Sequence, residues 1–102
     1  MYRYQFHAQV RMGHWRDFQV LVDELNAALR VKGLIPFQLW QAAFGRLNDT
    51  LMVAEYGSLE AYERDYFALH ADAACMDLWR QIGEHVDGSL WTDLWWRPSE
   101  GV

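Results

Sequence analysis

Residues 2–12 read YRYQFHAQVRM, and this stretch decides how the rest of the chain must pack. Apolar and polar residues alternate along it, and a period of two predicts a β-strand with one apolar and one polar face. The apolar face consists of Tyr2, Tyr4, Phe6, Ala8, Val10 and Met12. The polar face consists of Arg3, Gln5, His7, Gln9 and Arg11.

The segments after this strand predict an alternation of helices and strands. Apolar spacing predicts a helix over residues 14–31 that stops near Gly33. Residues 37–44 and 50–56 predict two strands joined as a hairpin by the turn residues 45–49. A helical region then begins at Ser58 and breaks at Asp72, each a suitable helix N-cap. After an expected turn at residues 87–88, residues 90–96 predict the last strand.

This order is β-α-β-β-α-β, so we expect an α+β fold of the ferredoxin-like kind, with helices on one face of an antiparallel sheet. The length of 102 residues fits a single domain that spans residues 1–102. The strands at residues 37–44, 50–56 and 90–96 carry apolar side chains on both faces. Strands of that kind are usually covered on both sides, and a second subunit packed sheet against sheet would cover them.

Composition supports an association of subunits and excludes several classes of protein. Hydrophobic residues make up 52% of the chain, with 6 Trp, 5 Tyr and 5 Phe, whereas a domain of this size buries only about 60–70% of its surface. The single cysteine excludes a disulfide scaffold and a zinc ribbon. A net charge of −5 argues against a nucleic-acid partner. The lack of a long apolar run argues against a membrane span, and the alternating N-terminus argues against a signal peptide, so we expect a cytoplasmic protein.

Residues 44–63, FGRLNDTLMVAEYGSLEAYE, resemble the NIPSNAP group of the dimeric α+β barrel superfamily. The matching features are the Gly-x-x-Asn turn, the apolar strand that ends in Glu-Tyr, and the Ser-Leu-Glu-Ala that follows; Gly13 and Trp79 also fit. The resemblance implies a homodimer with a cavity in each subunit. The superfamily includes small antibiotic-biosynthesis monooxygenases, haem-degrading oxygenases, isomerases and cyclases, so it implies no single reaction.

The polar face of the first strand offers the main candidate site. If both faces of the sheet are covered, Gln5, His7 and Gln9 either line a cavity or form an interface in which their hydrogen bonds are satisfied. His7 is the candidate acid/base, since imidazole titrates near neutral pH, and Gln5 and Gln9 would orient a ligand. Glu55 is a second catalytic candidate, because a carboxylate in an apolar strand needs a basic partner such as Arg11 or Arg97, or has a raised pKa.

Aromatic residues supply the candidate substrate-binding positions Trp40, Tyr66 and Trp96. They could pack on a flat ligand, and the alternative is ordinary core or interface packing. The sequence therefore predicts a protein that binds a small aromatic or hydrophobic molecule, such as a natural-product intermediate. A cofactor-independent monooxygenase, cyclase or isomerase would act on it, with no metal and no other cofactor. The alternatives are a non-catalytic ligand-binding or protein-interaction module, or a haem-binding protein with His7 or His70 as ligand, and whether the chain is an enzyme at all stays open.

Overall fold

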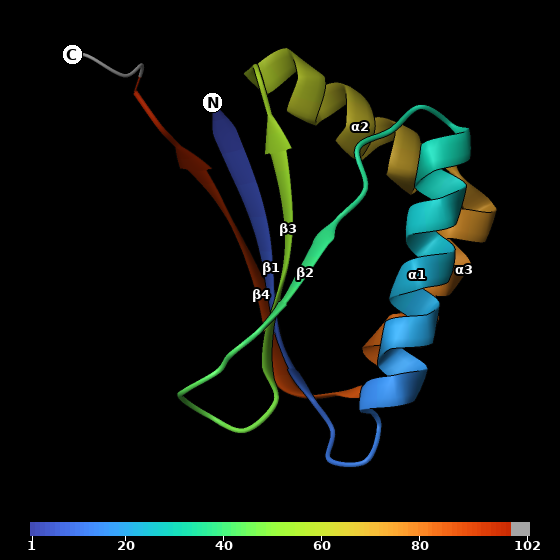
Figure 1. The fold of residues 1–102 in the computed structure, drawn as a ribbon. Coiled ribbons are helices and arrows are strands. Elements are labelled where there is room, and N and C mark those ends of the chain that lie inside the picture. The colour runs from blue at the N-terminus through green and yellow to red at the C-terminus, as the bar shows by residue number, and fades with distance from the viewer. Residues whose placement is uncertain (99–102) are drawn as a thin grey trace.

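The alternating N-terminal segment forms β1, Tyr2–Val10, at the centre of an antiparallel sheet in this computed structural model (Figure 1). The structure describes residues 1–98, except for the side chains of residues 88 and 89. The other elements follow in the order α1 (Trp15–Val31), β2 (Gln38–Gln41), β3 (Asp49–Tyr56), α2 (Leu59–Ala71), α3 (Ala73–Gly83) and β4 (Val86–Trp96).

The sheet has the strand order β2-β3-β1-β4, and every neighbouring pair is antiparallel. Tyr4 on β1 lies opposite Ala54 on β3 and Leu94 on β4. All three helices lie on one side of the sheet, and the other side is uncovered (Figure 1). The predicted α+β, ferredoxin-like arrangement is therefore confirmed.

Local capping explains where the helices begin and end. Gly33 takes a positive φ of 73° after α1, and the amides of Gly33 and Leu34 donate to the carbonyls of Arg30 and Leu29, which is a Schellman ending. Ser58 caps α2 by accepting from the amide of Ala61 at 3.1 Å. Asp72 caps α3 in the same way, by accepting from the amide of Cys75 at 2.8 Å. Both predicted N-caps and the predicted break at residue 72 are confirmed.

The core lies between the sheet and the helices. Alternate side chains of β1 and β3 meet the apolar stripe of α1, in which Phe18, Val22, Leu25 and Leu29 are almost fully buried. Met52 from β3 and Ile82 from α3 complete this cluster. Apolar residues recur every two positions along the strands and about every 3.6 positions along the helix. Both periods therefore place apolar side chains in this core.

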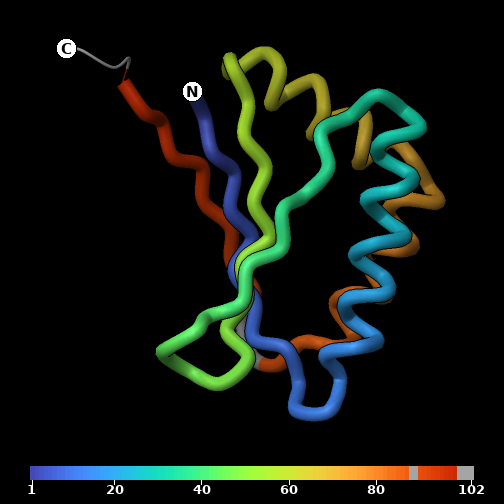
Figure 2. The backbone as a smooth tube through the Cα atoms, viewed as in Figure 1, coloured from blue at the N-terminus to red at the C-terminus, as the bar shows by residue number. Residues whose placement is uncertain are grey.

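Two predicted strand boundaries were wrong. β2 ends at Gln41 rather than at residue 44, because residues 42–47 lie exposed in the connection to β3. This connection extends past the sheet on the side away from the helices (Figure 2). β4 starts at Val86 rather than at residue 90, because it pairs along β1 as far as Val10, with a register shift between His7 and Gln9. Within residues 1–98, no helix is long and apolar enough to cross a membrane.

Candidate functional site

The pairing of the strands assigns each predicted site residue to one side of the sheet. Odd-numbered residues of β1, including Gln5, His7 and Gln9, point to the uncovered face, and the even-numbered ones point to the helices. Glu55 lies opposite Arg3, and Trp40 lies opposite Leu51, so both belong to the uncovered face. Tyr66 is on α2, on the other side of the sheet. The predicted residues therefore do not form a single site.

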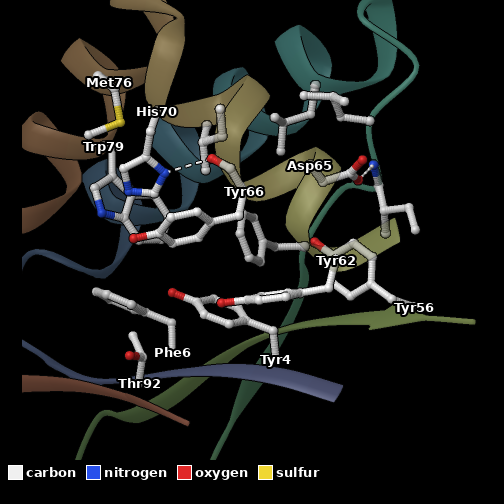
Figure 3. Close-up of a pocket in the computed structure, with 15 residues that line it drawn as sticks. Tyr4, Phe6, Tyr56, Tyr62, Asp65, Tyr66, His70, Met76, Trp79 and Thr92 are labelled. Carbon is white, nitrogen blue, oxygen red and sulfur yellow. Dashed lines mark hydrogen bonds between the residues drawn. The ribbon is translucent and has the colours of Figure 1, made fainter. Parts of the chain in front are cut away.

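A cavity with a polar and aromatic lining lies between the sheet and the helices. Its volume is about 400 Å³. In Figure 3 the side chains of Tyr4 and Phe6 rise from the sheet, and those of Tyr66, His70 and Trp79 descend from the helices. The lining residues are Tyr4, Phe6, Leu29, Leu34, Ile35, Phe37, Tyr56, Tyr62, Asp65, Tyr66, Leu69, His70, Met76, Trp79 and Thr92.

Tyrosine rings form a connected row along this cavity. The ring centroids of Tyr4 and Tyr62 are 5.8 Å apart, those of Tyr62 and Tyr66 are 5.9 Å apart, and those of Tyr56 and Tyr62 are 5.6 Å apart. Phe6 and Trp79 meet edge to face at 4.7 Å. These separations lie in the favourable range for aromatic pairs, so the lining is a largely pre-organised aromatic surface.

The phenol groups of Tyr4, Tyr56 and Tyr62 are hydrogen-bond donors at neutral pH. Burial raises the pKa of Tyr4 to about 12, and the neighbouring Tyr62 and Tyr66 add to the effect. Burial, followed by the charge of Asp65, raises the pKa of Tyr56 as well. Burial is also the main reason that the pKa of Tyr62 is raised. A protonated phenol can donate one hydrogen bond to a ligand oxygen, so the cavity combines apolar rings with uncharged donors.

His70 is held in a defined state at the cavity. Its Nδ1 lies 2.8 Å from the carbonyl oxygen of Tyr66, one turn earlier on α2. A carbonyl only accepts, so Nδ1 carries the proton, and in the neutral ring Nε2 keeps a free lone pair. The imidazole also packs on the ring of Tyr66, with centroids 4.1 Å apart. His70 is an exposed residue of the cavity lining, and its Nε2 is the ring nitrogen that this bond leaves available.

Asp65 is the carboxylate of the cavity lining, and it is 4% exposed. Its Oδ2 accepts from the amide of Ile35 at 2.9 Å, and its Oδ1 accepts from Nε of Arg64 at 3.2 Å. The first of these bonds joins α2 to the segment between α1 and β2. Asp65 therefore both fixes that segment and adds a negative charge to the cavity.

A second hollow, of about 880 Å³, lies on the uncovered face of the sheet, and Gln5, His7, Gln9 and Trp40 are among its lining residues. Nε2 of His7 is 3.2 Å from both carboxylate oxygens of Asp93, and the imidazole stacks on Trp91 with centroids 3.5 Å apart. Gln5 donates to the same carboxylate at 3.1 Å. Desolvation alone raises the pKa of Asp93, but hydrogen bonds from Trp95, Gln5 and His7 outweigh it and hold this pKa below its ordinary value.

The other predicted residues make contacts of different kinds. Gln9 donates to the carbonyl of Leu47 and accepts from Arg46, both at 2.9 Å, so it holds the connection between β2 and β3. Glu55 pairs with Arg3 at 3.5 Å rather than with Arg11, which pairs with Asp87 at 3.9 Å. Trp40 donates to Gln38 at 3.2 Å.

Trp96 belongs to the helix side of the edge strand, where it is 64% exposed, and it is not among the lining residues of either hollow. Within residues 1–98, no three His, Cys, Asp or Glu side chains are grouped so that they could hold a metal ion.

Sequence reasoning missed most of the cavity lining on the helices. Tyr62, Tyr66 and His70 are four residues apart along α2, a spacing that places three ring side chains on one helix face. That spacing was a usable signal for Tyr62 and His70. Asp65 gave no sequence signal of this kind, because an acidic residue on a surface helix usually faces solvent.

Comparison with solved structures shows a shared fold. An uncharacterised NIPSNAP domain protein from Burkholderia xenovorans superposes with a TM-score of 0.78 at 13% identity, over 100% of this chain and 98% of that one. A NIPSNAP family protein from Agrobacterium tumefaciens superposes with a TM-score of 0.75 at 16% identity, over 98% of this chain and 94% of that one. An antibiotic biosynthesis monooxygenase superposes with a TM-score of 0.74 at 14% identity, over 97% of this chain and 100% of that one.

The structural resemblance to NIPSNAP proteins and to a small monooxygenase is thereby confirmed. No family model matches the sequence, and a search of curated proteins gives no match. At identities of 13–16%, the likeness concerns the fold, and a function must be argued from the site.

Proposed function

We propose that this protein binds a small aromatic or hydrophobic molecule in the cavity between its sheet and its helices. One observation carries the proposal: a cavity of about 400 Å³ lined by aromatic rings together with a few convergent polar groups. Ligand sites typically have a volume of about 300–1,000 Å³ and this mixture of apolar walls and few polar groups. We therefore propose this cavity, rather than the hollow of the uncovered face, as the site of the small-molecule function expected from the sequence.

The chemistry that fits this lining is cofactor-independent oxygenation of the bound molecule by dioxygen as the oxidant, or its cyclisation or isomerisation. Each of these reactions can begin with removal of a proton from an electron-rich substrate. The free Nε2 of His70 is placed to accept it, and the protonated hydroxyls of Tyr4 and Tyr62 can donate to an oxygen on which negative charge develops. We therefore propose His70 as the acid/base group of the cavity, with Tyr66 packed against the ligand.

His7 and Glu55 do not belong to the proposed cavity site. Both lie on the uncovered face, where His7 is bound to Asp93 and Glu55 to Arg3, so neither reaches a molecule on the helix side of the sheet. Their catalytic roles, and the ligand contacts expected of Gln5, Gln9 and Trp40, remain predictions about the hollow on that face.

The uncovered face itself supports a homodimer. Trp40, Trp91 and Trp95 are 58%, 53% and 61% exposed on it. Leu51 on β3 and the polar residues Arg3, Gln5 and His7 on β1 lie between Trp40 and the two tryptophans of β4. Exposed aromatic side chains with polar residues among them are typical of a subunit interface, where aromatic residues are enriched. We propose that two subunits pack these faces together, as the resemblance to dimeric α+β barrels implies.

The binding proposal is tested by filling the cavity. Titration calorimetry with 2-naphthalenemethanol, an uncharged aromatic alcohol, should show binding to the unmodified protein. Thr92→Phe adds a ring at the lining of the cavity and should weaken this binding at least about tenfold, because the volume is taken by the new side chain. Ala42→Phe adds the same ring to the hollow of the uncovered face and should leave the affinity within about twofold. Weakening by Ala42→Phe alone would move the site to the other face and contradict the proposal.

A further inference from the structure

The cavity has an unusual balance of charge. One carboxylate, Asp65, is among its described lining residues, which include no lysine and no arginine. Its other polar side-chain groups are phenols, the hydroxyl of Thr92, the indole N–H of Trp79 and the imidazole of His70. An anionic ligand would therefore lose its hydration beside a buried carboxylate, whose cationic partner Arg64 is not among the lining residues.

The carboxylate of Asp65 has unused capacity to accept hydrogen bonds. An ionised carboxylate offers about four acceptor positions, and the bonds from Ile35 and Arg64 use two of them. The Arg64 side chain is 66% exposed, and it is not among the residues that line the cavity. Solvent therefore screens its charge, while the carboxylate it contacts is buried.

The aromatic lining also favours a positively charged ligand. The faces of tyrosine and tryptophan rings attract cations through the ring quadrupole. Tyr4, Tyr62, Tyr66 and Trp79 bring four such rings to the cavity from β1, α2 and α3 (Figure 3). The net charge of −5 adds a long-range attraction for cations.

We propose that the ligand of this cavity is a hydrophobic organic cation, an amine or a quaternary ammonium compound. Its charged nitrogen lies toward Asp65, and its apolar part lies among the tyrosine and tryptophan rings. This inference rests on the function proposed above, because it specifies the charge of the molecule that the cavity binds. It gives Asp65 a ligand-binding role in addition to its structural bond to Ile35.

The test compares three probes that share one naphthalene ring: 2-naphthylmethyl-trimethylammonium, 2-naphthalenemethanol and 2-naphthylacetate. Titration calorimetry with the unmodified protein should give an affinity for the cation at least about tenfold above that for the alcohol. The anion should bind at least about tenfold more weakly than the alcohol. These differences follow from the carboxylate and the rings together.

The Asp65→Asn variant tests whether the carboxylate of Asp65 causes the preference for the cation. Asparagine keeps an oxygen that can accept from the amide of Ile35, so the variant should retain the fold while it loses the charge. Its affinity for the cation should fall at least about tenfold, and its affinity for the alcohol should stay within about twofold. Glu63→Gln, which removes an exposed carboxylate two residues away on α2, is the matched control and should change neither affinity.

The outcomes separate this inference from the proposed function. If the alcohol and the cation bind equally, or the anion binds best, the cavity is a binding site but the cation inference is wrong. If none of the three probes binds, the proposed function itself is overturned, and the inference falls with it. The comparison on the unmodified protein decides these cases even if Asp65→Asn does not fold.

Discussion

Asn26 shows how one side chain sets the path of the chain that leads to the cavity. It is buried on α1, where its Nδ2 donates to the carbonyl of Phe37 and its Oδ1 accepts from the amide of Phe37, both at 2.8 Å. This pair replaces the hydrogen bonds that water would otherwise make to Phe37. It fixes the entry to β2 and places Phe37 in the cavity wall.

Asn26→Ala should therefore be strongly destabilising. The variant leaves one buried amide and one buried carbonyl without partners, and each such group costs about 1–3 kcal/mol. We expect the free energy of unfolding, measured by urea denaturation, to fall by about 2–4 kcal/mol. The control Asp23→Ala changes an exposed residue of the same helix and should stay within about 0.5 kcal/mol. Equal, small effects of the two variants would show that the Asn26 pair does not stabilise the fold.

At the scale of elements, Asp72 connects three helices. It ends α2, caps α3, and forms an ion pair with Lys32, which follows α1. The hydrogen bond from Lys32, together with that from the amide of Cys75, lowers the pKa of Asp72 to about 2. The folded state therefore favours the ionised carboxylate more than the unfolded chain does.

This shift predicts a specific dependence on pH. Because the folded pKa lies below the ordinary value of about 4, the stabilisation is complete above about pH 4 and is lost as the pH falls toward 2. Asp72→Asn keeps a good N-cap but loses the ion pair. It should unfold at a lower urea concentration than the unmodified protein at pH 7, and this difference should shrink between pH 4 and pH 2. A difference that stays constant across this range would exclude the ion pair as its cause.

At the scale of the whole molecule, the uncovered sheet face predicts self-association. Trp91→Glu and Trp95→Glu each place a charge on the exposed aromatic surface, and burial of an unpaired charge is costly. Sedimentation equilibrium should show a dimer for the unmodified protein and a monomer for either variant. Val31→Glu, at an exposed position at the end of α1, should remain a dimer. A monomeric unmodified protein at micromolar concentration would contradict the barrel arrangement.

The fold was largely predictable because its signals are local. The alternation in residues 2–10, the stripe of α1, and the caps at Ser58 and Asp72 each depend on a few neighbouring residues, and the structure retains them. The ends of β2 and β4 were less predictable, since they depend on pairing with β3 and β1 rather than on their own sequences.

The site was harder to predict because its position depends on tertiary packing. The sequence shows that His7 and Tyr4 lie on opposite faces of one strand, but not on which face the helices leave a cavity. His7 and Tyr66 were therefore expected together, and the structure separates them by the sheet. Asp65 joins the cavity only because α2 packs against β3, and no local sequence pattern predicts that contact.

Solution NMR can show whether a small molecule binds between the sheet and the helices. Nuclear Overhauser contacts would be measured between 2-naphthalenemethanol and the aromatic protons of the isotope-labelled protein. We expect contacts from the probe to Tyr4, Tyr62, Tyr66 and Trp79, which line the cavity. Contacts confined to His7, Trp40 and Trp91 would instead locate the molecule on the opposite face of the sheet, and the proposed cavity site would be wrong.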